Sequence, residues 1–225
     1  MHKKTKILLV DDHQLILEGM VSYLKNIDTL EIVTANSCDQ AFFKIKTALN
    51  TSPFHIVFTD LSFNENKKNS VLDGGEALIA AIKKENIDIK TAVISGHSET
   101  NRVFNVIHNL KPCAFILKES CNTDELTFAI QKILKNEVYY THEIHQKLLK
   151  RALVKIQMDE IAIQILKELP KHPKIANLEG VIKKLDGSTV KVRSIEGKLS
   201  KLRTDLQAQN NTDLVIKAKE LGIID

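Results

Sequence analysis

Three aspartates in the first part of the chain could form an acidic pocket. Asp11 and Asp12 follow an apolar run at residues 7–10, and Asp60 follows a second run at residues 54–59. Carboxylates that converge on one place repel one another unless a cation joins them. Hard oxygen ligands with room for water suit Mg²⁺. These residues therefore predict a magnesium site, provided that the two runs are neighbouring strands.

A serine and a lysine could extend this pocket to phosphate. Ser95 follows an apolar run at residues 91–94, and Lys118 follows another at residues 114–117. A serine hydroxyl can donate to a phosphoryl oxygen, and a lysine is a point charge suited to phosphate. A carboxylate beside them could attack a phosphoryl group while metal and ammonium neutralise its oxygens. Any one of these residues alone would be interpreted as a turn former or a solvated side chain, so the prediction rests on the set.

The apolar runs are the strands that must position these residues. Five runs of strand length alternate with helix-period segments between Lys6 and Glu137, at residues 7–10, 30–35, 54–59, 91–94 and 114–117. The first, third and fourth are nearly all apolar, which is typical of parallel strands buried on both faces. This pattern predicts an α/β fold with a flavodoxin-like, doubly wound, five-stranded parallel sheet. Ligands of such sheets bind at the carboxyl ends of the strands, where all the polar residues above lie.

The pattern changes after Glu137. A polar, basic stretch comes first, with Glu143 as its one acid from residue 141 to 156, and we interpret it as a linker that is partly helical. Only helix-length periods follow, at residues 158–169, 174–185, about 194–206 and 211–221. The predicted domains are residues 1–137, a linker at 138–156, and a small all-α domain at 157–225.

Composition and charge exclude several classes of protein. A hydrophobic content of 43% with a net charge of +4 excludes a disordered chain, and only 8 Gly and 4 Pro exclude a collagen-like one. The apolar runs are too short for a transmembrane helix or a signal peptide, so we expect a cytoplasmic protein without a membrane partner. The three cysteines, Cys38, Cys113 and Cys121, show no metal-ligand spacing and are interpreted as free thiols in a reducing compartment.

Over about residues 5–135 the sequence resembles the receiver domain of bacterial two-component response regulators. The matching segments are Ile7-Leu-Leu-Val-Asp-Asp-His13, Val57-Phe-Thr-Asp60, Val93-Ile-Ser95-Gly96 and Ala114-Phe-Ile-Leu-Lys118-Glu119. Each segment alone is a weak signal, and their combination is specific. The resemblance implies a phosphorelay in which a sensor histidine kinase phosphorylates Asp60.

The resemblance also implies roles for the other pocket residues. Mg²⁺ would be bound by Asp12, by Asp60 and by the backbone carbonyl of Ser62, with Asp11 completing the acidic pocket. Ser95 and Lys118 would hold the phosphoryl group. Phe115 matches the aromatic residue whose rotamer follows phosphorylation, and a plain core role for Phe115 is an equal alternative.

One segment departs from the family. A Met-Pro pair soon follows the phosphoacceptor of a receiver, and Asp-Gly comes about seven residues on. Here Asp60-Leu-Ser-Phe63 lacks the proline, and Asp73-Gly74 comes thirteen residues after Asp60. The extra segment, residues 64–72, is interpreted as a tolerated surface insertion, because added loop length costs little. A lid over the pocket is the alternative.

The tail resembles the four-helix DNA-binding domain of the NarL/LuxR type in a divergent form. The clearest part is residues 206–215, followed by Ala218 and by residues 221–224. Residues 194–202 align with the recognition helix, and residues 181–185 align with the helix before it, across a turn about three residues longer than usual. The resemblance therefore implies a helix-turn-helix module. An alternative register starts the recognition helix at Ser188-Thr189, but it misplaces Leu202 and Leu206.

The preferred register divides the recognition helix into two faces. A stripe of apolar residues faces the core, namely Ile195, Leu199, Leu202 and Leu206. The predicted DNA contacts are Lys198, Lys201, Arg193, Arg203 and Ser194. Residues 174–203 carry eight basic side chains against three acidic ones, a moderate footprint for phosphate backbone.

The leading hypothesis is a transcription regulator that is not itself an enzyme. It would be phosphorylated on Asp60, bind DNA through the helical domain, and form a homodimer on phosphorylation or DNA binding. A phosphatase on the same sheet is one rival, but it would want a second acid two residues after the nucleophile, where Ser62 stands. A signalling protein whose helical domain binds a protein partner instead of DNA is the other.

Overall fold

The computed structural model describes residues 4–63 and 70–224, without the side chains of residues 154–157. Residues 64–69 of the predicted insertion lie outside this description. The chain divides into two compact units, one of Met1–Ser98 with Asn105–Ile144 and one of Glu99–Phe104 with His145–Asp225. Among the described residues, no helix is both long enough and apolar enough to cross a bilayer.

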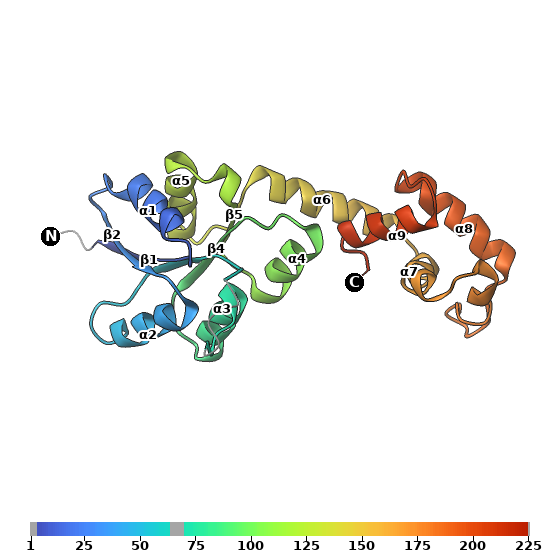
Figure 1. Cartoon of the computed structure of the whole chain (residues 1–225), viewed down its shortest axis with the longest axis horizontal. Coiled ribbons are helices and arrows are strands. Elements are labelled where there is room, and N and C mark those ends of the chain that lie inside the picture. The colour runs from blue at the N-terminus through green and yellow to red at the C-terminus, as the bar shows by residue number, and fades with distance from the viewer. Residues whose placement is uncertain (1–3, 64–69, 225) are drawn as a thin grey trace. The chain divides into compact units, whose positions relative to one another are not determined.

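The first unit is built on a parallel sheet (Figure 1). Its strands lie in the order β2-β1-β3-β4-β5-β6, and every neighbouring pair is parallel. The strands are β1 (Thr5–Val10), β2 (Leu30–Ala35), β3 (Ile56–Thr59), β4 (Lys90–Ser95), β5 (Ala114–Leu117) and β6 (Tyr139–Tyr140). The predicted α/β fold and its five strands are confirmed. The sixth strand has only two residues, too few for a hydrophobic pattern to indicate it.

Helices cover both faces of this sheet. They are α1 (Gln14–Leu24), α2 (Cys38–Ala48), α3 (Gly74–Lys84) and α5 (Thr123–Leu134). The short helix α4 (Thr100–Asn105) falls almost wholly in the second unit, and the π-helical turn that follows it at Val106–Leu110 belongs to the first. Figure 1 shows α1 and α5 on one side of the strands and α2 and α3 on the other. Successive residues of a strand point to opposite faces. Ile7 and Leu9 accordingly pack in the core under α1 and α5, whereas Leu8 and Val10 pack in the core under α2 and α3.

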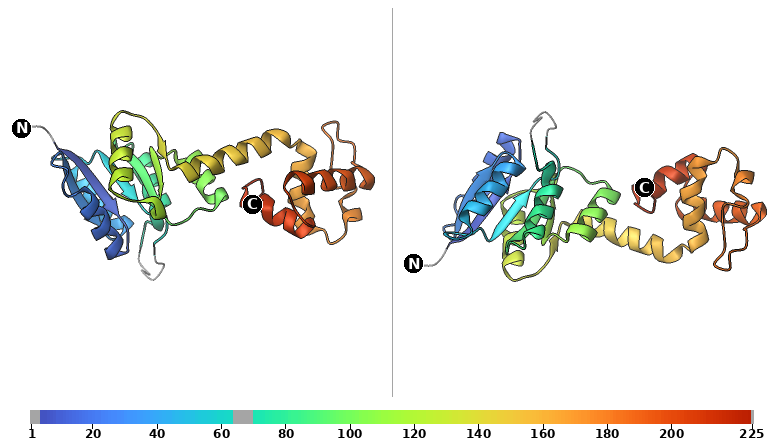
Figure 2. Two further views of the ribbon diagram at one scale, coloured as in Figure 1. Left: turned by 90° about the horizontal axis from the view of Figure 1, so that it is seen from above. Right: turned by 90° about the horizontal axis from the view of Figure 1, so that it is seen from below.

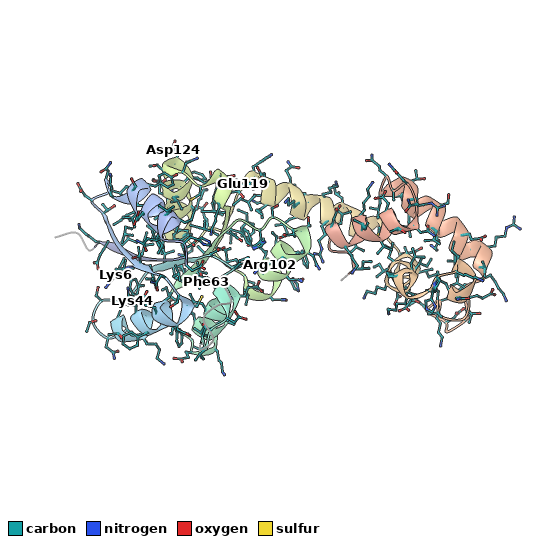
Figure 3. The ribbon with its side chains drawn as sticks, viewed as in Figure 1. Lys6, Lys44, Phe63, Arg102, Glu119 and Asp124 are labelled. Carbon is teal, nitrogen blue, oxygen red and sulfur yellow. The ribbon has the colours of Figure 1, made fainter. Side chains whose placement is uncertain are left out.

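The residues on both sides of segment 64–69 contact the core under α2 and α3, or α2 itself. Phe63, which precedes the insertion, packs against this core (Figure 3). At the other end, the Asp39 carboxylate of α2 accepts hydrogen bonds from the backbone N–H groups of Val71 and Leu72, both at 3.0 Å. Residues 71 and 72 therefore lie against the start of α2.

The second unit is helical. Its elements are α6 (His142–Gln157), which begins in the first unit, α7 (Glu160–Glu168), the 3-10 turns η3 (Leu169–Lys171) and η4 (Ile175–Leu178), α8 (Val192–Asp205) and α9 (Asn211–Glu220). Figure 2 shows α7, α8 and α9, in orange to red, packed together at the C-terminal end of the chain. Most of the segment that we interpreted as a linker is the 16-residue helix α6.

Two expectations for this unit had different outcomes. The predicted apolar stripe of α8 is confirmed, because Ile195, Leu199, Leu202 and Leu206 all belong to the core. The predicted helix at residues 174–185 is wrong, because only one 3-10 turn forms there. Gly180, inside this segment, has φ +88°, a left-handed backbone conformation that interrupts a helix.

Candidate functional site

The strand ends bring Asp11, Asp60 and Lys118 together. Parallel pairing sets Val10 beside Thr59, so the next residues, Asp11 and Asp60, leave the sheet side by side. Lys118 follows β5, and its Nζ lies 2.6 Å from Asp11 Oδ2 and 2.8 Å from Asp60 Oδ2. Both carboxylates are buried, with 1% of Asp11 and 5% of Asp60 exposed. One ammonium group therefore bridges two buried carboxylates.

This ion-pair network keeps Lys118 charged. Burial lowers the pKa of Lys118, but the hydrogen bonds and the charge attraction to Asp11 and Asp60 together outweigh burial and raise the pKa above its ordinary value. A charged lysine at this place can stabilise negative charge that is brought to Asp60.

Asp12 and His13 extend the acidic group. His13 Nδ1 lies 3.0 Å from Asp12 Oδ1 and 3.2 Å from Asp11 Oδ1. One ligand atom from each of these three residues falls within a 4.8 Å cluster. Carboxylate oxygens so close together fit the Mg²⁺ that the sequence predicts. His13 was missed by sequence reasoning, and its place next to Asp12 was the only available signal.

Ser95 and Phe115 lie on the two neighbouring strands. Ser95 ends β4, is fully buried, and its Oγ accepts a hydrogen bond from the backbone N–H of His97 at 3.0 Å. Its pairing with Leu117 places it beside the strand end that carries Lys118. Phe115 in β5 is also fully buried, as a core residue or an inward-turned aromatic would be. Ser62 lies in the loop after β3, two residues beyond Asp60.

Two glycines let α3 approach the backbone of Asp60. A Cβ on Gly75 would overlap the carbonyl oxygen of Asp60, and one on Gly74, which has φ +87°, would lie 2.7 Å from that of Leu61. The Gly75 N–H also donates to the Leu61 carbonyl at 3.2 Å. These glycines were not predicted as part of the site.

Gly75→Ala should therefore disturb both stability and the pocket. The new methyl group must push the Asp60 backbone aside, and we expect a loss of about 2 kcal/mol in the free energy of unfolding. Urea denaturation measures this loss. The matched control is Gly19→Ala in α1, where a Cβ meets nothing within 4 Å, and stability should rise by about 0.5–1 kcal/mol. Equal stability of the two variants would contradict the close packing of α3 on Asp60.

The predicted DNA contacts on α8 fall into two groups. Arg193, Ser194 and Lys201 are exposed. Lys198 instead forms an ion pair with Asp159, the N-cap of α7, and Arg203 Nη1 donates to Asn211 Oδ1 at 2.7 Å. The hydrogen bond from Lys198 is the main reason that the pKa of Asp159 is lowered. Two of the five predicted contacts are thus tied to partners inside the helical unit.

Comparison with known proteins places the chain in a family. Residues 7–131 match the response regulator receiver domain. The response regulator protein VraR of Staphylococcus saprophyticus is 24% identical over 219 residues, which cover 97% of this chain and 98% of that protein. A nitrate/nitrite response regulator protein homolog of Haemophilus influenzae is 28% identical over 151 residues, 67% of each chain.

Solved structures share the fold along the whole chain. A structure of two RcsB dimers bound to two parallel DNAs has a TM-score of 0.61 at 19% identity and covers 97% of this chain and 99% of its own. A structure of the Salmonella typhimurium RcsB response regulator gives a TM-score of 0.62, with the same identity and coverage.

Proposed function

The chain belongs to the response regulator receiver family, and from this premise we propose that it is a cytoplasmic transcription regulator, phosphorylated on Asp60 by a sensor histidine kinase. The receiver would span residues 1–137 and the DNA-binding domain residues 157–225. The observation that carries the proposal is the Lys118 ammonium held between Asp11 and Asp60. Buried carboxylates and a charged lysine meet where a phosphoryl group would arrive.

In the proposed reaction, a carboxylate oxygen of Asp60 attacks the phosphorus of a phosphohistidine. The bond from phosphorus to the histidine nitrogen breaks, and an acyl phosphate forms on Asp60. Lys118 would transfer one of its contacts from the Asp60 carboxylate to a phosphoryl oxygen, so its charge stays paired. The Ser95 hydroxyl would donate to a second phosphoryl oxygen. Asp11, Asp12, Asp60 and the Ser62 carbonyl would hold Mg²⁺, which neutralises phosphoryl charge when bound.

An exposed apolar patch beside the pocket supports a protein as phosphodonor. Leu15, Ile16 and Tyr23 on α1 are exposed, and Leu15 has 82% of its surface accessible. They line a cavity of about 150 Å³ that Lys118 also lines. An apolar surface at the entrance to a charged pocket is a suitable docking surface for a kinase.

DNA binding by the helical domain is the second part of the proposal. The full-length likeness to RcsB, which is bound to DNA in one of its structures, supports it. So do the exposed Arg193 and Lys201 on α8. Lys198 and Arg203 already bind Asp159 and Asn211 within the domain, so they are less available to DNA. This observation favours the alternative, a helical domain that binds a protein partner in place of DNA. Binding to unspecific duplex DNA that weakens steeply with salt would distinguish DNA from a protein partner.

Phosphorylation should strengthen DNA binding. An acyl phosphate on Asp60 adds charge that Ser95 and Lys118 can bind, which favours one conformation of the β4 and β5 ends. If that conformation favours a homodimer, the two helical domains of the dimer bind neighbouring DNA sites at the same time, which raises the overall affinity. We expect an affinity gain of about 5- to 150-fold, which is typical of coupled sites.

Sedimentation velocity and DNA titration on the same samples, with and without acetyl phosphate, measure this coupling. Unchanged mass and unchanged affinity after full phosphorylation would contradict it. The Asp60→Asn variant is the control, and acetyl phosphate should change neither its mass nor its affinity for DNA.

A further inference from the structure

A β-hairpin occupies residues 182–190, and its first strand stands where the resemblance implied a helix at residues 181–185. Lys183 and Thr189 form an antiparallel bridge. The backbone N–H of Lys184 donates to the Ser188 carbonyl at 2.9 Å, and that of Val190 donates to the Ile182 carbonyl at 3.0 Å. Gly187 at φ +80° allows the turn. The segment before α8 is therefore a short ribbon.

The base of this hairpin is anchored in the helical unit. Ile182 is fully buried and Val190 is 3% exposed, and both belong to the core of the unit. Gln164 of α7 binds both backbone groups of Lys183. Its Oε1 accepts from the Lys183 N–H and its Nε2 donates to the Lys183 carbonyl, both at 3.1 Å. The side-chain amide of Gln164 thus makes the two backbone hydrogen bonds that a neighbouring strand would make. These bonds hold the first strand of the hairpin against α7.

The tip of the hairpin is ordered by its own hydrogen bonds. Asp186 Oδ1 accepts from the backbone N–H of Ser188 at 2.9 Å and from its hydroxyl at 2.6 Å. Leu185 at the tip is 93% exposed, the most exposed large hydrophobic residue among those described. The exposed side chain of Leu185 contributes nothing to the core of the helical unit, and a ligand that bound there could bury it.

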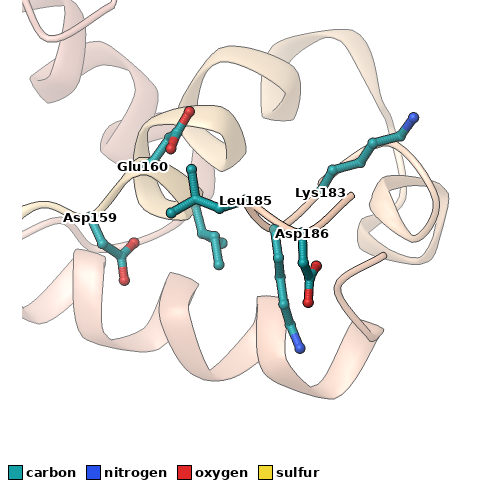
Figure 4. Close-up of a pocket in the computed structure, with 7 residues that line it drawn as sticks. Asp159, Glu160, Lys183, Leu185 and Asp186 are labelled. Carbon is teal, nitrogen blue, oxygen red and sulfur yellow. The ribbon is translucent and has the colours of Figure 1, made fainter. Parts of the chain in front are cut away.

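The charges beside the tip suit an anionic ligand. Lys183 and Lys184 are exposed, and no carboxylate in the described part of the chain lies within ion-pair distance of either. Figure 4 shows Lys183 extending away from Asp159 and Glu160. Of the acids nearby, Asp159 pairs with Lys198, and Asp186 accepts hydrogen bonds from Ser188.

The tip also lies beside the proposed DNA-binding face of α8. It shares a cavity of about 350 Å³ with the start of α7 at Asp159, Glu160 and Ile161 (Figure 4). Asp159 in turn pairs with Lys198 of α8. At the base of the hairpin, Lys191 alone separates Val190 from the first residue of α8. DNA that meets the N-terminal half of α8 therefore passes close to the hairpin.

We propose that this hairpin is a second DNA-contacting element. Lys183 and Lys184 bind phosphates next to the groove that α8 enters, and Leu185 packs into the adjacent minor groove. Lysine contacts to phosphate release counterions, and leucine is among the apolar side chains that proteins place in minor grooves. This inference rests on the proposed function, because it requires a helical domain that binds DNA.

The test measures the affinity of the phosphorylated full chain for an unspecific duplex over a range of salt concentrations. The double variant Lys183→Gln, Lys184→Gln should lose about two units of the log–log salt slope. Leu185→Ala should weaken binding about fivefold and leave the salt slope unchanged, because its contact is apolar. Matched controls are Lys219→Gln and Ile216→Ala, two exposed positions on α9 that should leave both quantities unchanged.

The outcomes separate this inference from the proposed function. A parent protein that binds no duplex DNA overturns both. A parent that binds DNA with a steep salt slope, together with hairpin variants that bind in the same way, overturns the hairpin contact alone. If Leu185→Ala alters sedimentation but not DNA affinity, the tip is a contact between copies and the inference is wrong. All three substituted residues are exposed, so thermal unfolding should be unchanged in the variants.

Discussion

Lys118→Met is expected to lower the free energy of unfolding by about 3 kcal/mol at neutral pH in the absence of Mg²⁺. The reason is that two buried carboxylates, Asp11 and Asp60, lose the ammonium group that bridges them. Removing one partner of a buried ion pair leaves an uncompensated charge, which costs several kcal/mol. Methionine fills a similar volume, so lost packing adds little. Urea denaturation in the presence of EDTA measures the loss.

Two comparisons make this result specific. Lys84→Met removes an exposed lysine at the end of α3 and should change stability by less than about 0.5 kcal/mol. Added Mg²⁺ should restore part of the lost stability of Lys118→Met, because a cation that binds the carboxylates of the native state replaces the missing charge. If Lys118→Met and Lys84→Met lower the free energy of unfolding equally, Lys118 does not compensate the buried charges of Asp11 and Asp60.

The pH dependence of the parent follows from the raised pKa of Lys118. A group whose pKa is higher in the folded protein than in the unfolded chain contributes stability that is complete below the unfolded value. For Lys118 that value is 10.5, and the contribution is lost as the pH rises through the higher folded pKa. The stability difference between parent and Lys118→Met should therefore narrow in strongly alkaline solution.

The geometry of the pocket could be predicted from the sequence because it depends on strand ends. Apolar runs identify the central strands, and parallel pairing aligns their carboxyl ends at one edge. Asp11, Asp60 and Lys118 therefore had to meet once the order of the strands was set. No such rule places the His13 ring against Asp11 and Asp12, since that contact depends on the conformation of side chains and not on the pairing of strands. The approach of Gly75 to Asp60 likewise depends on where the insertion returns to the sheet.

The helical domain was harder to predict because similar spacing fits two structures. Leu178, Ile182 and Leu185 recur at helical intervals, yet the chain forms a 3-10 turn and a hairpin there. Antiparallel pairing and the Gln164 contacts stabilise the hairpin, and neither is visible in a hydrophobic period. The apolar stripe of α8 was predictable because the helix is long. The partner of Lys198 was not, because it depends on the position of α7.

The most direct test of the account is intact-mass spectrometry of the full chain after incubation with acetyl phosphate. With Mg²⁺ the parent should gain the mass of one phosphoryl group, and with EDTA it should gain none. Asp60→Asn should gain none under either condition, because the amide cannot act as the nucleophile. The control Asp28→Asn, at an exposed aspartate outside the pocket, should behave like the parent. Full phosphorylation of Asp60→Asn would contradict the assignment of Asp60 as the phosphoacceptor.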